Sequence, residues 1–316
     1  LLLLDPGPDA ESIVARPLRV RVPVNVAAFE RALEQLGLDS QTARAMDVHV
    51  DASGGRIQLF ASHLYLHEER GCYTVRLSTL VADAAALESL PGDTPWRTVY
   101  ESHPCLALDR SVNGERQLFD GSQSGGRIAR LDPDTLLMTV GDLRHNGVSL
   151  PEIYPQDTNN SYGKIIAIDT RDWSERIYSL GHRNPQGLHV DAQGTVWSTE
   201  HGPRGGDELN REQPGGNFGW PHVTYGASYR DMNWPLNRTQ GTHEGYLRPV
   251  FAWVPSIGIS NLVRYRGNLF QHWRDDLLIG SLRDQSLWRV HVENDHAMVT
   301  ERIDPNTGAL EFSGHE

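Results

Sequence analysis

One phrase that recurs along the chain constrains its fold more than any other feature of the sequence. Each copy begins with an acidic or glycine-containing turn, continues with β-branched or aromatic residues, and ends in small or polar ones. The copies are Asp51–Ser62, Asp132–Asp142, Asp191–Glu200 and a shortened Asp275–Leu282. They lie roughly 60 to 80 residues apart, which is long for a solenoid but natural for propeller blades that carry insertions.

A second strand-like run follows three of the copies, at Cys72–Leu77, Lys164–Asp169 and Ser286–Val290. Hairpin-linked strands repeated in this way predict four-stranded blades around a central axis. A β-sandwich is the main alternative, but it gives no reason for the same phrase to recur. We therefore expect an all-β fold, a single propeller domain over residues 1–316.

The composition agrees with short strands joined by tight turns, because the chain has 30 Gly, 18 Pro, 8 Trp and 10 Tyr. Helix is scarce, and Val24–Leu36 is the best candidate, with apolar residues near helical spacing and Gly37 as its stop. The segment Arg204–Arg248 is rich in Gly, Asn, Trp and Tyr. We interpret it as a loop at the mouth of the propeller, where binding residues tend to concentrate.

Charge and hydropathy exclude several classes of partner. The formal net charge of −12 argues against nucleic acid, which needs clustered Lys and Arg. No stretch approaches the roughly 18 apolar residues that span a bilayer. The opening Leu1–Leu4, with no Met before it, suggests a processed or trimmed N-terminus.

The chain has two cysteines, Cys72 and Cys105. An even pair is compatible with one disulfide in an oxidising compartment, although two buried free thiols would give the same sequence. We favour the disulfide and expect a periplasmic or secreted protein.

Three neighbouring motifs offer chemistry. Gly181–Leu188 (Gly-His-Arg-Asn-Pro-Gln-Gly-Leu) supplies a cation and two amides at the entry to a strand. Glu200–Asn210 contains a Gly-Pro turn, whose carbonyls can approach a cation, beside an Asp-Glu pair. Gly215–Pro221 follows. Because calcium takes carbonyl and carboxylate oxygens, the second motif suits one or two Ca²⁺ ions. Each motif alone is more often structural.

Together the motifs resemble the soluble quinoprotein glucose dehydrogenases and the related aldose sugar dehydrogenases. These are six-bladed β-propellers that use pyrroloquinoline quinone (PQQ) and Ca²⁺. The resemblance runs over residues 122–290 and is strongest over Gly181–Pro221. It implies oxidation of a small aldose at the anomeric carbon, with the hydride passing to the quinone. The electron acceptor is left open.

The resemblance also assigns residues to the cofactor. Arg183 and Asn184 would bind the quinone, with Gln186 supporting the turn and His201 beside the cofactor. PQQ carries carboxylates that two arginines would bind in bidentate fashion. Arg183 would also stabilise negative charge that develops on the quinone oxygen.

Further assignments concern calcium and the remaining pocket wall. The carbonyls of Gly202 and Pro203 would bind the Ca²⁺ that PQQ also chelates, and this ion would act as a Lewis acid. Asp207 and Glu208 match positions that bind a second calcium in some members. The segment 253–256, which begins with Trp253, would line the pocket, and Arg283 stands where some members place a cofactor-binding lysine.

One departure from the family concerns the general base. The family's histidine position falls at Gln123 when residues are counted back from Gly141 and Asp142. An amide cannot accept a proton near neutral pH, and a general base typically contributes about 10²–10⁴ in rate. Asp142, His145 or Asp157 are the candidates to replace it.

A second departure lies at the C-terminus. The family's paired arginines should follow Ile303, but the chain reaches Glu316 without them. The last blade is expected to be truncated or to be closed by an N-terminal strand such as Leu18–Val24.

Three functions remain open at this point. The first is the PQQ- and Ca²⁺-dependent dehydrogenase, weakened by Gln123. The second is a non-catalytic binding propeller, as in the hedgehog-interacting proteins, and Gln123 favours it. The third, a calcium-dependent lactonase, is disfavoured because it would need acidic and amide side chains around a central metal.

Overall fold

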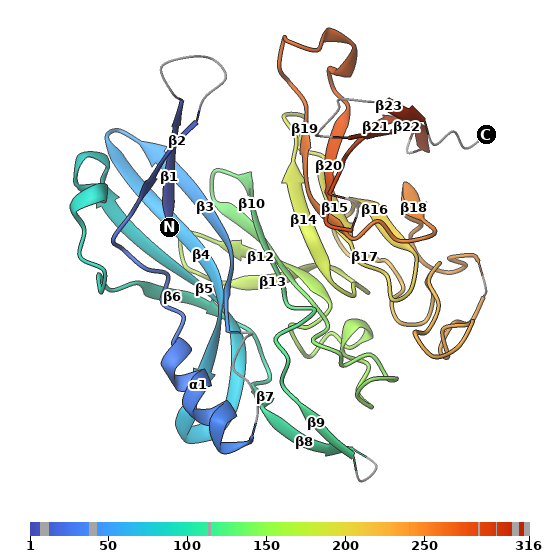
Figure 1. Cartoon of the computed structure of the whole chain (residues 1–316), viewed down its shortest axis with the longest axis horizontal. Coiled ribbons are helices and arrows are strands. Elements are labelled where there is room, and N and C mark those ends of the chain that lie inside the picture. The colour runs from blue at the N-terminus through green and yellow to red at the C-terminus, as the bar shows by residue number, and fades with distance from the viewer. Residues whose placement is uncertain are drawn as a thin grey trace. The chain divides into compact units, whose positions relative to one another are not determined.

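The computed structural model describes residues 1–6, 13–37, 43–112, 115–239, 241–283, 285–294, 296–304 and 310–312. The chain divides into two compact units, Leu1–Asp109 and Arg110–Glu316, which are treated separately here (Figure 1). Strands dominate the described residues, with one α-helix and four short 3₁₀ segments among them. The predicted all-β class is confirmed. Within the described ranges, no helix has the length and apolar character that a bilayer crossing requires.

The first unit is built on an antiparallel sheet in the order β3-β4-β5-β6, with β7 also paired to β5. Its strands are β1 (Leu2–Pro6), β2 (Ile13–Pro17), β3 (Ala45–Ser53), β4 (Arg56–His67), β5 (Cys72–Asp83), β6 (Arg97–Glu101) and β7 (Leu106–Ala107). Its helical segments are α1 (Val26–Gln35), η1 (Glu68–Arg70) and η2 (Ala84–Ser89). β1 and β2 form a separate hairpin.

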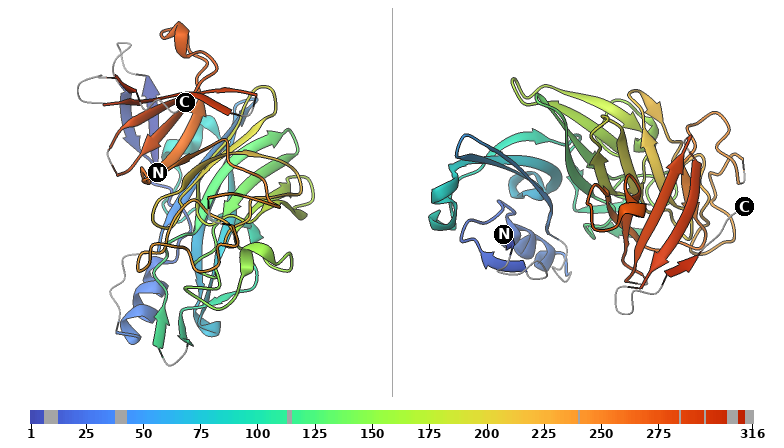
Figure 2. Two further views of the ribbon diagram at one scale, coloured as in Figure 1. Left: turned by 90° about the vertical axis from the view of Figure 1, so that its right-hand side faces the viewer. Right: turned by 90° about the horizontal axis from the view of Figure 1, so that it is seen from above.

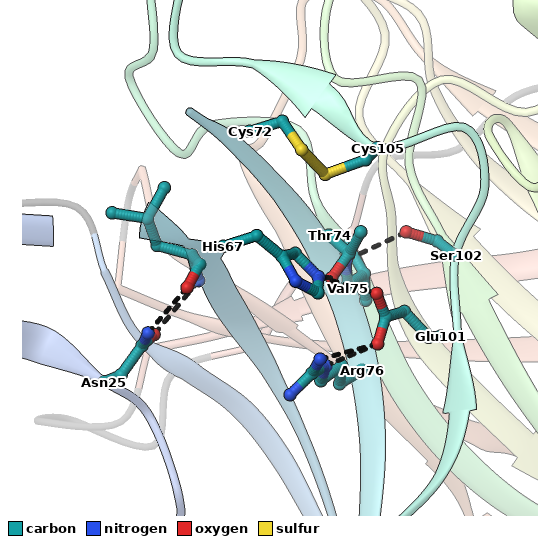
Figure 3. Close-up of a disulfide and its surroundings, with 10 residues drawn as sticks. Asn25, His67, Cys72, Thr74, Val75, Arg76, Glu101, Ser102 and Cys105 are labelled. Atoms are coloured by element: carbon teal, nitrogen blue, oxygen red, sulfur yellow. Dashed lines mark hydrogen bonds and ion pairs between the residues drawn. A yellow bond between two sulfur atoms is a disulfide. The ribbon is translucent and has the colours of Figure 1, made fainter. Parts of the chain in front are cut away.

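The predicted helix forms as α1 and buries Ala28, Phe29 and Leu33. Gly37 follows it with φ +74°, a left-handed conformation that glycine adopts at little cost. Asn25 fixes the start of the helix, because its side-chain amide exchanges two hydrogen bonds with the backbone of Leu66 on β4 (Figure 3).

The segment Leu18–Val24 is not a strand, which corrects the expectation that it closes the last blade. Val20 is fully buried and packs with Leu59, Leu80 and Leu87 in the core of the first unit. Apolar side chains therefore hold this segment in place, and no ladder of hydrogen bonds is needed.

The predicted disulfide joins Cys72, at the start of β5, to Cys105 (Figure 3). Close to it, Ser102 accepts a hydrogen bond from the backbone N–H of Val75, and Glu101 pairs with both His67 and Arg76. The bridge therefore ties the segment after β6 back to the middle strand of the sheet.

We expect the free energy of unfolding of a Cys72→Ser, Cys105→Ser double variant to be about 3–4 kcal/mol lower than that of the wild type. The cysteines are 33 residues apart, and a cross-link over such a loop mainly restricts the unfolded chain. Urea denaturation under non-reducing conditions, followed by a spectroscopic signal from the first unit, measures this loss. Equal stability of the two proteins would contradict the prediction, and wild type treated with reductant should match the variant.

The second unit contains three further sheets, ordered β10-β11-β12-β13-β17, β14-β15-β16-β18 and β19-β20-β21-β22-β23 (Figures 1 and 2). The strands of the first are β10 (Gly125–Asp132), β11 (Thr135–Val140), β12 (Lys164–Asp169), β13 (Glu175–Leu180) and β17 (Gly216–Asn217). Those of the second are β14 (Pro185–Val190), β15 (Val196–Glu200), β16 (Asp207–Glu212) and β18 (Phe251–Trp253). Those of the third are β19 (Ile259–Arg264), β20 (Leu277–Ser281), β21 (Leu287–Glu293), β22 (His296–Ile303) and β23 (Leu310–Phe312). The hairpin β8 (Asp109–Val112) and β9 (Glu115–Leu118) and the turns η3 (Tyr154–Gln156) and η4 (Gln271–Trp273) complete the elements.

Every copy of the repeated phrase coincides with the second strand of a sheet: β4, β11, β15 and β20. The second strand-like runs are the third strands β5, β12 and β21. In the second unit the first strands pack together, β10 against β14 and β14 against β19. This is a blade-like arrangement with first strands innermost. Among the described residues, the second unit has three such sheets and the first unit has one more sheet with its strands in chain order, fewer than the six blades expected.

The segment Arg204–Arg248 is not all loop, because it contains β16. Asp207, Glu208, Asn210 and Glu212 are buried on this strand although all are polar. Residues 207–212 show no hydrophobic alternation, so their pattern does not predict a strand. Its polar side chains form an internal hydrogen-bonded network, described below.

Candidate functional site

The site begins where backbone bonds connect residues next to β11, β12 and β14. Asp142 N–H donates to the carbonyl of Arg183 (2.8 Å), Gly163 N–H to that of Gly141 (3.1 Å), and His182 N–H to that of Gly163 (3.1 Å). Polar residues that are far apart in sequence therefore meet at one end of the second unit.

Gln123 lies between the two charged residues of this group. In the amide orientation that satisfies both neighbours, its nitrogen donates to Asp142 Oδ1 (2.7 Å) and its oxygen accepts from Arg183 Nη2 (3.2 Å). Its backbone is left-handed (φ 56°). A Cβ on Gly141 would lie 1.9 Å from the Gln123 carbonyl oxygen, so only glycine fits there. The predicted trio Gln123, Asp142 and Arg183 is thus brought together.

Asp142 is fully buried and its carboxylate is saturated with donors. It accepts from Arg144 N–H (2.8 Å), Asn146 Nδ2 (3.3 Å) and Trp220 Nε1 (2.8 Å), in addition to Gln123. A carboxylate offers about four lone-pair positions. Burial raises the pKa of Asp142 to about 6, although these bonds and a nearby guanidinium oppose the shift. Asp142 therefore has no position left for a substrate hydroxyl.

Both ring nitrogens of His145 also have partners. Its Nδ1 is 3.0 Å from the carbonyl of Leu143, and its Nε2 is 3.2 Å from Arg110 Nη1, which assigns the proton to Nδ1. Burial lowers the pKa of His145 to about 4. Asp157 is exposed, and its carboxylate bonds Asn159 in its own turn. Neither residue presents a poised base to the group around Gln123.

Arg183 is buried against Trp220, whose ring centroid is 5.6 Å from the guanidinium carbon. Its Nη1 donates to the carbonyl of His201 (3.1 Å), while its Nε is buried and has no partner among the described residues. A buried guanidinium N–H without a partner is costly, so this atom is suited to receive an acceptor from a ligand.

A buried network behind Arg183 was missed in the sequence. The Glu200 carboxylate accepts from the N–H of Arg183 (2.7 Å), His182 Nδ1 (3.1 Å) and Asn210 Nδ2 (3.0 Å). Burial opposes the charged form of His182, but the carboxylates of Glu212 and Glu200 outweigh it, so the pKa of His182 lies above its ordinary value. The network holds the turn that carries Arg183.

Three residues of this network are arranged like the Ser-His-acid triad of a hydrolase. Ser179 Oγ lies 2.9 Å from His182 Nε2, and the Glu200 carboxylate lies at His182 Nδ1. However, Ser179 and His182 have no exposed surface, so no substrate reaches the hydroxyl. We assign these residues a structural role.

A cavity open to solvent adjoins Arg183, with about 250 Å³ of empty space that includes the open solvent. Its lining consists of Gly181, Arg183, Glu200, His201, Gly202, Gly206, Glu208, Phe218, Trp220, Val223 and Thr224. Burial lowers the pKa of the His201 imidazole and raises that of the Glu208 carboxyl. A Cβ on Gly202 would lie 2.2 Å from the Gly205 carbonyl oxygen, so the wall is bare backbone at that point.

Comparison with known proteins identifies the family. The sequence profile of "Glucose / Sorbosone dehydrogenase" matches residues 109–309, more than half of the chain. The chain belongs to this family. The predicted relationship is confirmed, and the chain is an oxidoreductase of the sugar dehydrogenase type.

Two curated relatives and one solved structure illustrate what this chain is similar to. Aldose sugar dehydrogenase YliI of Escherichia coli is 28% identical over 278 residues, which is 84% of this chain and 72% of the relative. Quinoprotein glucose dehydrogenase B of Acinetobacter calcoaceticus is 51% identical over 77 residues, 24% of this chain and 14% of the relative. The crystal structure of soluble aldose sugar dehydrogenase from E. coli in the apo-form has a TM-score of 0.69 at 24% identity, covering 96% of this chain and 84% of that one, and shows likeness of fold.

Two predicted cofactor residues of this sugar dehydrogenase lie elsewhere. Trp253 packs in the apolar core beside Phe251 and Trp288 and does not line the cavity, because its indole fills space between sheets. Arg283 is exposed on the turn after β20 and donates to the carbonyl of Ser256 (2.8 Å). Neither side chain lines the cavity, whose described lining includes one guanidinium, that of Arg183.

The structure places Asp207, a predicted metal ligand, among backbone donors. Its carboxylate accepts from the N–H groups of Gly202 (3.1 Å), Gly258 (2.8 Å) and Ile259 (3.0 Å). These bonds fix the turn that contains Gly202 onto the next sheet. Across the described ranges, no three His, Cys, Asp or Glu side chains are grouped as a metal site.

The remaining predicted residues lie near the cavity. Gln186 donates to Asn184 Oδ1 (2.8 Å), which also accepts from Gly125 N–H (3.4 Å). Asn184 thereby links the turn before β14 to β10, and Gln186 contacts Asn184 within this segment. Glu208 is buried 3.5 Å from His243 Nε2.

Proposed function

We propose that this family member oxidises a small aldose at its anomeric carbon with PQQ and Ca²⁺, and that it does so slowly. The observation that carries the proposal is the buried, unpartnered Nε of Arg183 at the wall of the cavity, with Gln123 at the position of the family's base.

The residues present fit the cofactor pair. Arg183 offers an unsatisfied donor for a carboxylate or quinone oxygen. Gly202 leaves backbone uncovered, and hard cations such as Ca²⁺ bind carbonyl oxygens. Arg183, Asn184 and His201 would hold the quinone, and the carbonyls of Gly202 and Pro203 would hold the calcium. Glu208 would balance the charge of the ion.

When bound, PQQ and Ca²⁺ would supply a hydride acceptor and a Lewis acid for oxidation at the anomeric carbon. Arg183 places its positive charge where negative charge develops during the reaction. Trp220 covers the guanidinium and excludes water on one side. Asp142 balances that guanidinium electrostatically and, through Gln123, limits its movement.

The step that lacks a residue is removal of the hydroxyl proton. Gln123 has both ends of its amide engaged, and Asp142 and His145 have no free acceptor. This supports slow turnover, and it also supports the second candidate, a propeller that binds cofactor or sugar without catalysis.

Several finer points remain proposals. Six blades in a single propeller domain are supported by the family match and by the sequential strand order that the four sheets share. Export to the periplasm or the medium is supported by the disulfide, which persists in oxidising compartments. The electron acceptor is unassigned.

The test is reconstitution of the chain with PQQ and Ca²⁺, followed by melting and dye-reduction assays over several aldoses. A ligand at about 100 times its dissociation constant stabilises by about 2.7 kcal/mol, so PQQ with Ca²⁺ should raise the melting temperature above that in EDTA. Dye reduction should be measurable but slow. Absence of any shift would contradict cofactor binding, and a shift without dye reduction would favour the binding propeller.

A further inference from the structure

Two glycine-containing segments, 202–206 and 225–229, are packed backbone to backbone in the second unit. Arg204 and Ala227 exchange two N–H···O=C bonds of 2.9 Å each. A Cβ on Gly226 would lie 2.4 Å from the Gly205 carbonyl oxygen, and one on Gly206 would lie 2.5 Å from the Gly226 nitrogen. The first segment contains the proposed calcium carbonyls, so the second acts as a clamp on them.

The clamp ends in Tyr229, whose hydroxyl donates to the carbonyl oxygen of Pro203 (2.8 Å). The tyrosine is 72% exposed. Burial of the ring therefore does not explain its position, and the hydrogen bond is the contact that links it to the turn. Neither the family resemblance nor the motif analysis assigned a role to this residue.

We propose that Tyr229 is a positioning residue that orients the Pro203 carbonyl for a divalent cation. The inference rests on the calcium site of the proposed function. A carbonyl oxygen has two lone pairs, so the hydroxyl occupies one and leaves the other for the ion. A turn that contains Gly202, Gly205 and Gly206 has much conformational freedom to lose. Fixing the carbonyl beforehand reduces the entropic cost of binding the ion.

The experiment is calorimetric titration of Ca²⁺ into the cofactor-free chain, for wild type and Tyr229→Phe. We expect the affinity of the variant to be about 2–10-fold lower, the range that one hydrogen bond supports. Its melting temperature in EDTA should stay close to that of the wild type, because the ring is exposed. The matched control is Tyr246→Phe, whose hydroxyl is bonded to His222 Nδ1 (3.0 Å) in the same unit and should leave Ca²⁺ affinity unchanged.

Gly226→Ala tests the clamp independently, because the added methyl group collides with the Gly205 carbonyl and should weaken Ca²⁺ binding further. Unchanged or tighter binding by Tyr229→Phe would overturn the inference while leaving the calcium site standing. No Ca²⁺ binding by the wild type would overturn the calcium site, and the inference with it.

Discussion

Replacing Gln123 with histidine should raise the aldose turnover of the PQQ- and Ca²⁺-loaded protein by about 10²–10⁴-fold, the usual contribution of a general base. The Asp142 carboxylate is already 2.7 Å from the side-chain nitrogen at this position. An imidazole there would donate one N–H to Asp142 and present its other nitrogen to the sugar hydroxyl. A buried acid that orients a histidine is the arrangement that makes imidazole an effective base.

Steady-state dye reduction measures this effect, with PQQ affinity determined in parallel. The affinity should change little, because Arg183 keeps its bonds to His201 and Glu200. In the control Gln123→His, Asp142→Asn, most of the gain should disappear. Fast turnover in the wild type, or no gain in the single variant, would show that another group takes the proton.

Glu200→Ala should lower the free energy of unfolding of the second unit by about 3–5 kcal/mol, the cost of removing one partner from a buried charged network. Its three donors, Arg183 N–H, His182 Nδ1 and Asn210 Nδ2, would be left without an acceptor in the interior. Chemical denaturation followed by tryptophan fluorescence measures the loss. PQQ affinity should also fall, since the turn that carries Arg183 is released.

Two variants serve as references for this measurement. Glu200→Gln keeps the shape and one acceptor, so its loss should be smaller, about 1–3 kcal/mol. Glu244→Ala removes an exposed glutamate of the same unit and should change stability by no more than about 0.5 kcal/mol. A Glu200→Ala variant as stable as the Glu244 variant would mean that the network contributes nothing to the fold.

The repeated phrase was sufficient to predict the second and third strands of the sheets, because those strands are apolar and bounded by turn residues. Strand β16 was missed for the opposite reason. Its inward side chains are Asp207, Glu208, Asn210 and Glu212, and a pattern method reads such residues as solvated loop. Partners from β15, from the Gly202 turn, from His243 and from the start of β19 make the burial of these residues possible.

The site residues were likewise predictable where backbone register positions them and not where side-chain partners do. Motif spacing brought Gln123, Asp142 and Arg183 together, because backbone register determines where strand ends meet. It misplaced Trp253 and Arg283, because side-chain direction and exposure depend on neighbours from other sheets. The role of Glu200 could have been suspected from its position at the end of an apolar strand, directly before His201.

Strand β16 contributes both to the wall of the cavity and to the buried network, and this limits which substitutions the protein can accept. Glu208 lines the cavity, while its strand neighbours Asp207 and Asn210 hold the Gly202 turn and the Glu200 carboxylate. Wall and scaffold are thus one strand, and a substitution that reshapes the cavity from this side also disturbs the protein's interior. New substrate preferences are therefore more accessible at Val223, which lines the cavity from a loop and can vary without dismantling a sheet. Directed evolution should concentrate its diversity there and leave β16 intact.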